Sequence, residues 1–175
     1  MARTITLNDG QRAQRKFLLT VAEWKENQTV TREILGTRTE DSSIEFNADI
    51  ATSTDILGIT YTDVNKTEPE QSFDPYYIIG GNKLGEYLSA AALRNDIDAY
   101  NGVFDIYIIT VFMTDGEATS ADGKYYAVKH SGCTILPTSI GGDSYVAMPI
   151  EVHYSNNITE GTVDVLTDDF VFTAA

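Results

Sequence analysis

Few residues in this chain could do nucleophilic or metal chemistry. The histidines are His130 and His153, and Cys133 is the single cysteine. Residues His130-Ser-Gly-Cys133 place two such side chains close together, but zinc needs three or four ligands in tight geometry, and no second cluster supplies them. We interpret Cys133 as a small buried residue and His130 as a surface histidine, and we expect no metal or thiol site there.

Two acidic motifs resemble sites but have simpler explanations. Residues 96–102 begin like a calcium loop, but tyrosine is fifth, glycine is seventh instead of sixth, and no glutamate closes the loop. A polar turn beside a helix explains them better. Asp168 and Asp169 resemble paired catalytic carboxylates, but in a chain with 26 acids such pairs arise by chance. We therefore expect neither an enzyme nor a cofactor.

The charge distribution is uneven. Residues 1–38 hold seven bases and four acids, which gives +3, whereas residues 39–175 hold five bases and 22 acids, which gives −17. Affinity for nucleic acid comes mainly from cations that neutralise phosphates, so a body this acidic repels DNA. The charge fits a surface kept soluble by repulsion, or one that meets DNA without holding it.

The elements around these residues are mostly strands, since apolar residues alternate at period two. The alternation predicts strands over 17–24, 56–63, 145–154, 162–165 and 170–173. In the third of these, Pro149 cannot donate to a ladder, which predicts an edge strand or a bulge. The run Phe104–Met113 is apolar on both faces and predicts a strand covered on both sides.

One helix is predicted over 82–95. Asn82 is a suitable N-cap, and Leu84, Leu88, Ala91 and Ala92 form one apolar stripe that should dock on a sheet. Residues 37–55 are polar and predict a protruding hairpin or long loop. Residues 65–74 predict a second exposed connection. No segment approaches the roughly 18 apolar residues of a membrane span, and no signal peptide is evident.

A family resemblance rests on three stretches. They are Ile44-Glu-Phe-Asn-Ala-Asp-Ile-Ala-Thr-Ser-Thr-Asp-Ile-Leu-Gly58, Phe73-Asp-Pro-Tyr-Tyr77 with the helix that follows it, and residues 132–154 with their Gly-Gly turn. Together with Ile158-Thr-Glu-Gly-Thr-Val163 they resemble the major tail tube proteins of long-tailed bacteriophages and of phage-tail-like bacteriocins.

The resemblance implies a single mainly β domain over 1–175, a β-sandwich with one flanking α-helix and a long protruding loop. Six subunits would close a β-barrel ring, and rings would stack through a loop at 37–55, an N-terminal arm at 1–16 and a C-terminal arm at 167–175. The implied function is a tail tube whose acidic lumen conducts DNA without specific binding. The implied partners are further copies of the chain, a tape measure protein and other tail proteins. The location would be a virion tail assembled in the bacterial cytoplasm.

The resemblance also suggests roles for single residues. Candidates for inter-ring contact are Glu40, Asp41, Glu45, Phe46 and Asp49, and their partners in the N-terminal arm would be Arg12, Arg15 and Lys16. Glu151 and His153 are candidates for facing the lumen. The alternatives left open are a β-sandwich binding module, a capsid decoration protein, an enzyme with an unrecognised site, and a tail terminator that stops at one ring.

Overall fold

The computed structural model describes residues 10–111, 124–164 and 170–175. Residues 1–9 of the predicted N-terminal arm, the pair Asp168-Asp169 and the last two residues of the run 104–113 lie outside them. The strands in chain order are β1 (Leu18–Glu26), β2 (Thr29–Ile34), β3 (Ile44–Glu45), β4 (Ala48–Thr54), β5 (Thr60–Thr67), β6 (Glu70–Phe73), β7 (Phe104–Thr110), β8 (Lys124–Pro137), β9 (Ile150–His153), β10 (Ile158–Asp164) and β11 (Val171–Ala174). The helices are the 3-10 turns η1 (Arg15–Phe17) and η2 (Ile97–Ala99) and the α-helix α1 (Lys83–Leu93).

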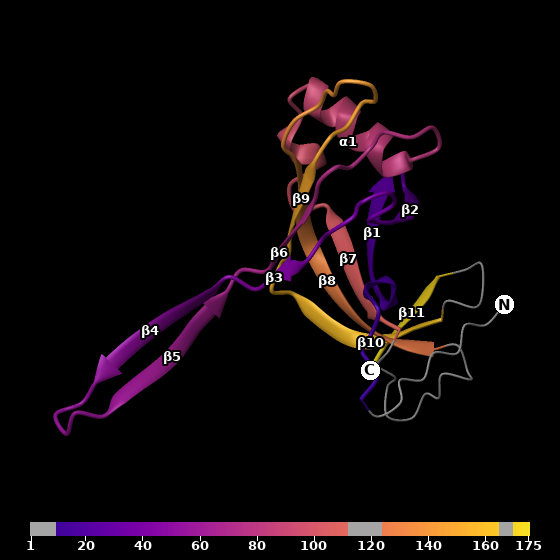
Figure 1. The fold of residues 1–175 in the computed structure, drawn as a ribbon. Helices are drawn as coiled ribbons and strands as arrows, with labels where there is room; N and C mark the ends of the chain where they lie inside the picture. Colours follow the sequence, from indigo (N-terminus) through magenta and orange to yellow (C-terminus); the bar gives the residue numbers. More distant parts are fainter. Residues whose placement is uncertain (1–9, 112–123, 165–169) are drawn as a thin grey trace.

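Nine strands form one branched sheet, and β4 and β5 form a separate two-stranded hairpin (Figure 1). The order in the large sheet is β2-β1-β7-β8-β9-β6-β3, and β10 and β11 branch from β8. The long strand β8 pairs with β10 through residues 124–130 and with β9 through residues 134–137. The mainly β prediction is confirmed for the described residues.

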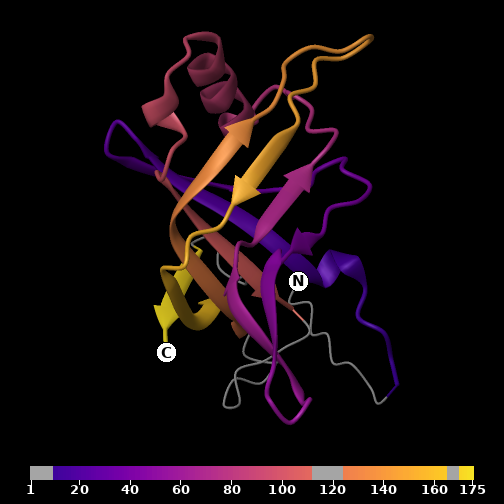
Figure 2. The same ribbon diagram turned by 90° about the vertical axis from the view of Figure 1, so that its left-hand side faces the viewer.

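The sheet curls over on itself into two sandwich-like layers and does not close into a barrel (Figure 2). Three strands separate β1 from β6 in the strand order, yet the Thr20 hydroxyl donates to Gln71 Oε1 at 3.0 Å. The main core lies between these layers. It contains Trp24, Phe73, Phe104, Ile106, Ile135, Ile150 and Val152, all at most 2% exposed.

A second, smaller core covers the other face of β1 and β7. It contains Val21, Tyr107, Ile109, Tyr125, Ala127 and Val163, with Phe170 and Phe172 packed against it. The rings of Phe170 and Tyr107 meet edge to face at 5.0 Å. Strand β7 is therefore covered on both faces, as the run from Phe104 predicted. The last residues of the predicted C-terminal arm are strand β11, which pairs with β10.

The helix α1 closes one end of the main core. Leu84, Leu88 and Ala91 are buried along one stripe, as their spacing predicted. The side chain of Asn82 accepts a hydrogen bond from the Gly85 N–H at 2.6 Å, which caps the first turn. No helix in the described ranges is long and apolar enough to cross a membrane.

The predicted strand over 145–154 and the predicted connection over 65–74 are wrong in detail. Strand β9 begins only at Ile150, directly after Pro149, so the proline ends up outside the ladder and β9 lies between β8 and β6 instead of at an edge. Residues 65–74 are not an exposed connection, because β5 extends to Thr67 and β6 follows at Glu70. Within β6, Gln71 and Phe73 are each 1% exposed.

Candidate functional site

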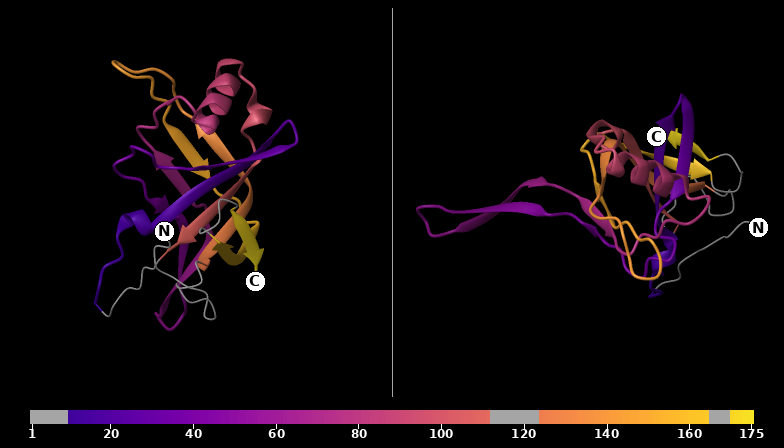
Figure 3. Two further views of the ribbon diagram at one scale, coloured as in Figure 1. Left: turned by 90° about the vertical axis from the view of Figure 1, so that its right-hand side faces the viewer. Right: turned by 90° about the horizontal axis from the view of Figure 1, so that it is seen from above.

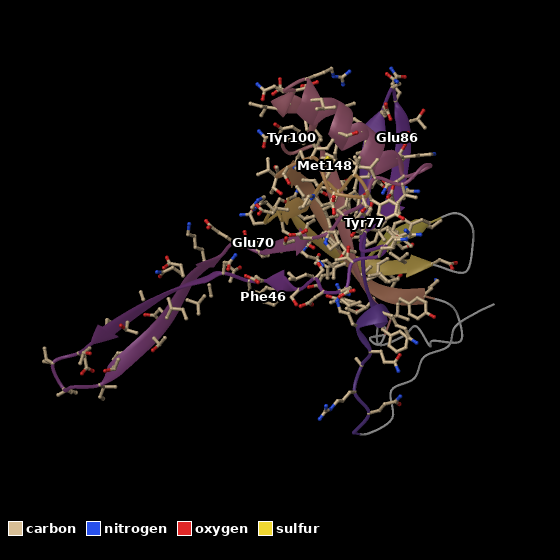
Figure 4. All side chains as sticks on the ribbon, turned by 45° about the horizontal axis from the view of Figure 1, so that its top comes forward. Phe46, Glu70, Tyr77, Glu86, Tyr100 and Met148 are labelled. Atoms are coloured by element: carbon tan, nitrogen blue, oxygen red, sulfur yellow. The ribbon has the colours of Figure 1, made fainter. Side chains whose placement is uncertain are left out.

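The β4–β5 hairpin projects away from the rest of the molecule (Figure 1). Every residue of both strands is exposed, and none belongs to either core. Its exposed apolar side chains include Ile50 (57%), Ile56 (102%), Leu57 (79%), Ile59 (50%), Tyr61 (50%) and Val64 (61%). Figure 4 shows side chains of the hairpin pointing away from its ribbon on both sides. An isolated two-stranded hairpin is at best marginally stable in water.

The two faces of the hairpin differ in charge. Directly opposed residues of an antiparallel pair share a face. The pairs Ile50–Val64, Thr52–Thr62 and Thr54–Thr60 therefore form one uncharged face. The other face carries Ala51 opposite Asp63 and Ser53 opposite Tyr61.

The tip of the hairpin is held by one carboxylate. Asp55 Oδ1 accepts hydrogen bonds from the Leu57 and Ile59 N–H groups, each at 2.9 Å, and the Tyr61 hydroxyl donates to Oδ2 at 3.2 Å. The Ile59 N–H contributes most to holding the pKa of Asp55 below its usual value. Gly58, at φ +80°, completes the turn. The predicted strand over 56–63 is thus wrong in its first half, because residues 56–59 form the turn.

The root of the hairpin is fixed to the body by a buried polar cluster. Gln71 Oε1 accepts from Thr20 and, at 2.6 Å, from the Tyr154 hydroxyl, and Gln71 Nε2 donates to Ser42 Oγ at 3.0 Å. Burial raises the pKa of Tyr154 far above its ordinary value, so the hydroxyl remains a donor. The guanidinium of Arg15 donates to the Ser42 carbonyl through Nε at 3.0 Å and Nη2 at 2.8 Å. The segments that enter and leave the hairpin are therefore both anchored.

The predicted inter-ring residues lie on two different parts of the molecule. Only Asp49 belongs to the hairpin, where it lies in β4, and Phe46 lies at its root (Figure 4). Glu40 and Asp41 precede β3, and Glu45 lies within β3. Asp41 and Glu45 line an acidic depression on the body together with Glu70, Asp74 and Glu151.

The three predicted basic partners have different surroundings in the structure. Arg15 is tied to Ser42 within the same chain. The Lys16 ammonium lies over the ring of Phe17 at 5.2 Å, and Arg12 is exposed. Glu151 and His153 project from the outer face of β9, where the His153 ring lies 3.6 Å from a Glu151 oxygen and 3.7 Å from a Glu70 oxygen.

The residues best suited to chemistry, His130 and Cys133, are buried and take part in the packing and hydrogen bonding of the fold. His130 is only 6% exposed, so the surface-histidine prediction is wrong; its Nδ1 lies 2.8 Å from the Ser155 carbonyl oxygen and its ring packs on Tyr154. Cys133 is buried as expected, and burial raises the pKa of its thiol. Within residues 10–111, 124–164 and 170–175, no three carboxylate, histidine or cysteine side chains are grouped to hold a metal.

From the sequence, the apolar residues at the tip and in the strands of the hairpin were not predicted to be exposed. The signal was present in Asp55-Ile-Leu-Gly58, an Asp/Gly turn flanked by alternating threonines. The three apolar residues at 56, 57 and 59 suggested a buried strand instead.

No family model matches the chain, and no curated protein is similar to it in sequence. Among solved structures, the sheath/tube terminator of an extracellular contractile injection system (PVC) is 13% identical with a TM-score of 0.47, and the alignment covers 86% of this chain and 98% of that chain. The tube-terminating cap of the anti-feeding prophage is 16% identical with a TM-score of 0.46, covering 93% and 99%. A chain of the anti-feeding prophage baseplate is 9% identical with a TM-score of 0.49, covering 92% and 100%. Similarity at this level identifies neither a family nor a function for this chain.

Proposed function

We propose that this protein is a non-catalytic structural subunit that assembles with further copies of itself into the tube of a phage-tail-like particle. The observation that carries the proposal is the β4–β5 hairpin. It is exposed along its whole length, presents six apolar side chains to solvent and packs on neither core. A surface outside its own chain would cover these side chains and add to the stability of the hairpin.

The firm attachment of the hairpin supports the same proposal. A flexible loop loses conformational entropy when it binds, whereas a preorganised element loses less. Here the tip is closed by Asp55 and the root by the cluster around Gln71. The tip and the flanking segments are thus held before a partner binds, so less conformational entropy would be lost on binding.

The finer form of the proposal is a stack of six-membered rings around an acidic lumen that conducts DNA. It is supported by the net charge of −14 and by the resemblance to tail tube proteins. Glu151 and His153 on the outer face of β9 are the proposed lumen residues, since that face also carries Glu70 and borders the acidic depression. The proposed partners are other copies, a tape measure protein and other tail proteins.

Negative-stain electron microscopy and sizing across a concentration series test this proposal. The wild-type chain should form hollow tubes or stacked rings above a threshold concentration. A variant in which a short Gly-containing turn replaces residues 48–67 should stay monomeric and folded. Leu93→Ser is the matched control, because Leu93 is a 73% exposed apolar residue of α1, outside the hairpin, and its loss should leave assembly unchanged.

Each outcome has a distinct meaning. Tubes that lengthen with concentration support a tube subunit, and single rings that never stack support a terminator. A wild-type chain that stays monomeric at high concentration and beside its tail partners would reject the proposal. A hairpin-deleted variant that assembles normally would reject the role of the hairpin.

A further inference from the structure

The body has a second apolar surface beside the smaller core, on the outer face of β1 and β2, where Ile34 is 55% exposed and Leu19 is half-buried. A depression there is lined by Leu19, Val21, Ile34, Ile109 and Phe170, together with Arg32 and Glu33. It continues past Leu19 and Ile34 into a second depression, whose further lining residues are Arg15, Lys16, Leu18, Leu35, Gly36, Thr37, Thr39, Glu40 and Ser42. We call the two together the β1–β2 groove.

The groove lies along an unpaired sheet edge. Strand β2 ends the strand order of the large sheet and pairs, among the described strands, with β1 alone. On the same face of β2, Ile34 is 55% and Val30 is 43% exposed. An exposed strand edge with apolar side chains readily accepts another chain.

Cations at the groove can face the acids of the hairpin. They are Arg15, Lys16 and Arg32, and of these Arg32 already pairs with the Glu23 carboxylate. The acids that line the groove are Glu33, which accepts from the Leu84 N–H and from the Tyr76 hydroxyl, and Glu40. The hairpin at 48–67 carries three acids, Asp49, Asp55 and Asp63, against Lys66, whose ammonium pairs with Glu68.

The hairpin extends away from β1 and β2, which carry the first depression, and only the second depression reaches Ser42 near the root of the hairpin. In Figure 1 the hairpin extends to the left, whereas β1, β2 and β11 lie on the right. The view from above in Figure 3 shows the same separation. The two surfaces therefore cannot meet within one chain, but they can meet between two copies, and each copy then keeps one free hairpin and one free groove.

We propose that the β4–β5 hairpin of one copy docks in the β1–β2 groove of the next copy. The uncharged face and the apolar tip cover the groove floor, and the acids of the hairpin lie near Arg15, Lys16 and Arg32. A contact between two different surfaces repeats from copy to copy, and it closes into a ring or continues as a filament. This inference rests on the proposed function and names the surface that receives the hairpin.

A mixing experiment tests the pairing directly. Leu57→Glu damages the tip of the hairpin and leaves the groove intact, whereas Ile34→Glu damages the groove and leaves the hairpin intact. Both residues are more than half exposed, so both variants should fold, which the fluorescence of the buried Trp24 reports. Each variant alone should need a concentration about tenfold or more above the wild-type threshold to assemble, because a charge replaces a buried apolar contact.

The equimolar mixture of these variants is the decisive sample. One intact hairpin and one intact groove remain, so mass measurement should show a species of two chains and nothing larger. Leu93→Glu, mixed in the same way with either variant, serves as the control for a charge placed on another exposed apolar residue.

The outcomes separate this inference from the proposed function. If Ile34→Glu assembles like wild type while Leu57→Glu does not, the hairpin acts in assembly but the groove is not its partner. If the mixture stays monomeric, the two surfaces do not bind each other. If the wild-type chain itself never assembles, the proposed function fails and this inference fails with it.

A cross-link gives a second readout. Leu57→Cys and Ile34→Cys, prepared separately and mixed with a short bismaleimide, should yield a covalent pair of chains, whereas either variant alone should yield far less. The native Cys133 is buried and should not compete. Equal cross-linking of the mixture and of the single variants would overturn the pairing.

Discussion

The body and the β4–β5 hairpin are both built from antiparallel strands, but they use their side chains in opposite ways. In β7, both faces are covered, one by the main core and one by the smaller core. In β4 and β5, every residue on either face is exposed. The strands of the body are stabilised by packing, whereas those of the hairpin are held by backbone pairing and by hydrogen bonds at the two ends. The comparison predicts that the body can fold without the hairpin, which contributes to neither core.

The largest expected difference follows from truncating one large side chain in each region. Phe104→Ala removes a ring that is 0% exposed and should lower the free energy of unfolding by about 3–5 kcal/mol. Ile50→Ala should change it by less than about 0.5 kcal/mol, because Ile50 is 57% exposed. Urea unfolding of the monomer, followed by Trp24 fluorescence, measures both. Equal losses in the two variants would break the comparison.

The polar cluster at the junction gives the next effect. Gln71→Ala leaves the hydroxyls of Thr20 and Tyr154 without their acceptor inside the body and should cost about 3 kcal/mol. Ser72→Ala, at the exposed neighbouring position of β6, is the control and should be close to neutral. The same urea titration applies. A neutral Gln71→Ala would show that the cluster does not hold the layers together.

Sequence alone predicted the elements with one dominant period and missed those whose residues depart from it. The helix at Asn82 and the double-faced strand at Phe104 have unambiguous patterns. Strand β6 was missed because Glu-Gln-Ser-Phe reads as polar, and only the three-dimensional cluster explains a buried Gln71. The hairpin was misplaced because Ile56 and Leu57 are apolar yet exposed, which is the property expected of a surface used between chains. A single sequence does not distinguish that property from burial in a core.

A smaller effect is expected at the helix cap of the body. Asn82→Ala removes the acceptor of the Gly85 N–H and should lower the free energy of unfolding by about 1 kcal/mol. Asn82→Asp keeps an oxygen acceptor at the same place and should restore most of the loss. Thermal unfolding followed by circular dichroism resolves the difference. An Asn82→Asp variant as unstable as Asn82→Ala would contradict the capping role.

The smallest effect is local to the tip of the hairpin. Since the pKa of Asp55 is lowered by the hydrogen bonds that its carboxylate accepts, the turn is favoured above the ordinary pKa of an aspartate and loses this support as the pH falls through the lowered value. Asp55→Asn should mimic that loss at neutral pH. Amide hydrogen exchange at Leu57 and Ile59 should quicken in Asp55→Asn, while exchange in β7 should not change. Unchanged exchange at the tip would show that the carboxylate is dispensable.

The attachment of the hairpin through β6 also determines how the chain bears load. The chain runs from β5 through two residues into β6, and β6 is hydrogen-bonded along its length to β9. The bonds of an antiparallel pair lie across the strands, so a pull along β6 stretches them together instead of one after another. Tension on the hairpin would therefore load the hydrogen bonds between β6 and β9 in shear. The same hairpin that is proposed to bind another copy would then transmit force to the body through this strand pair.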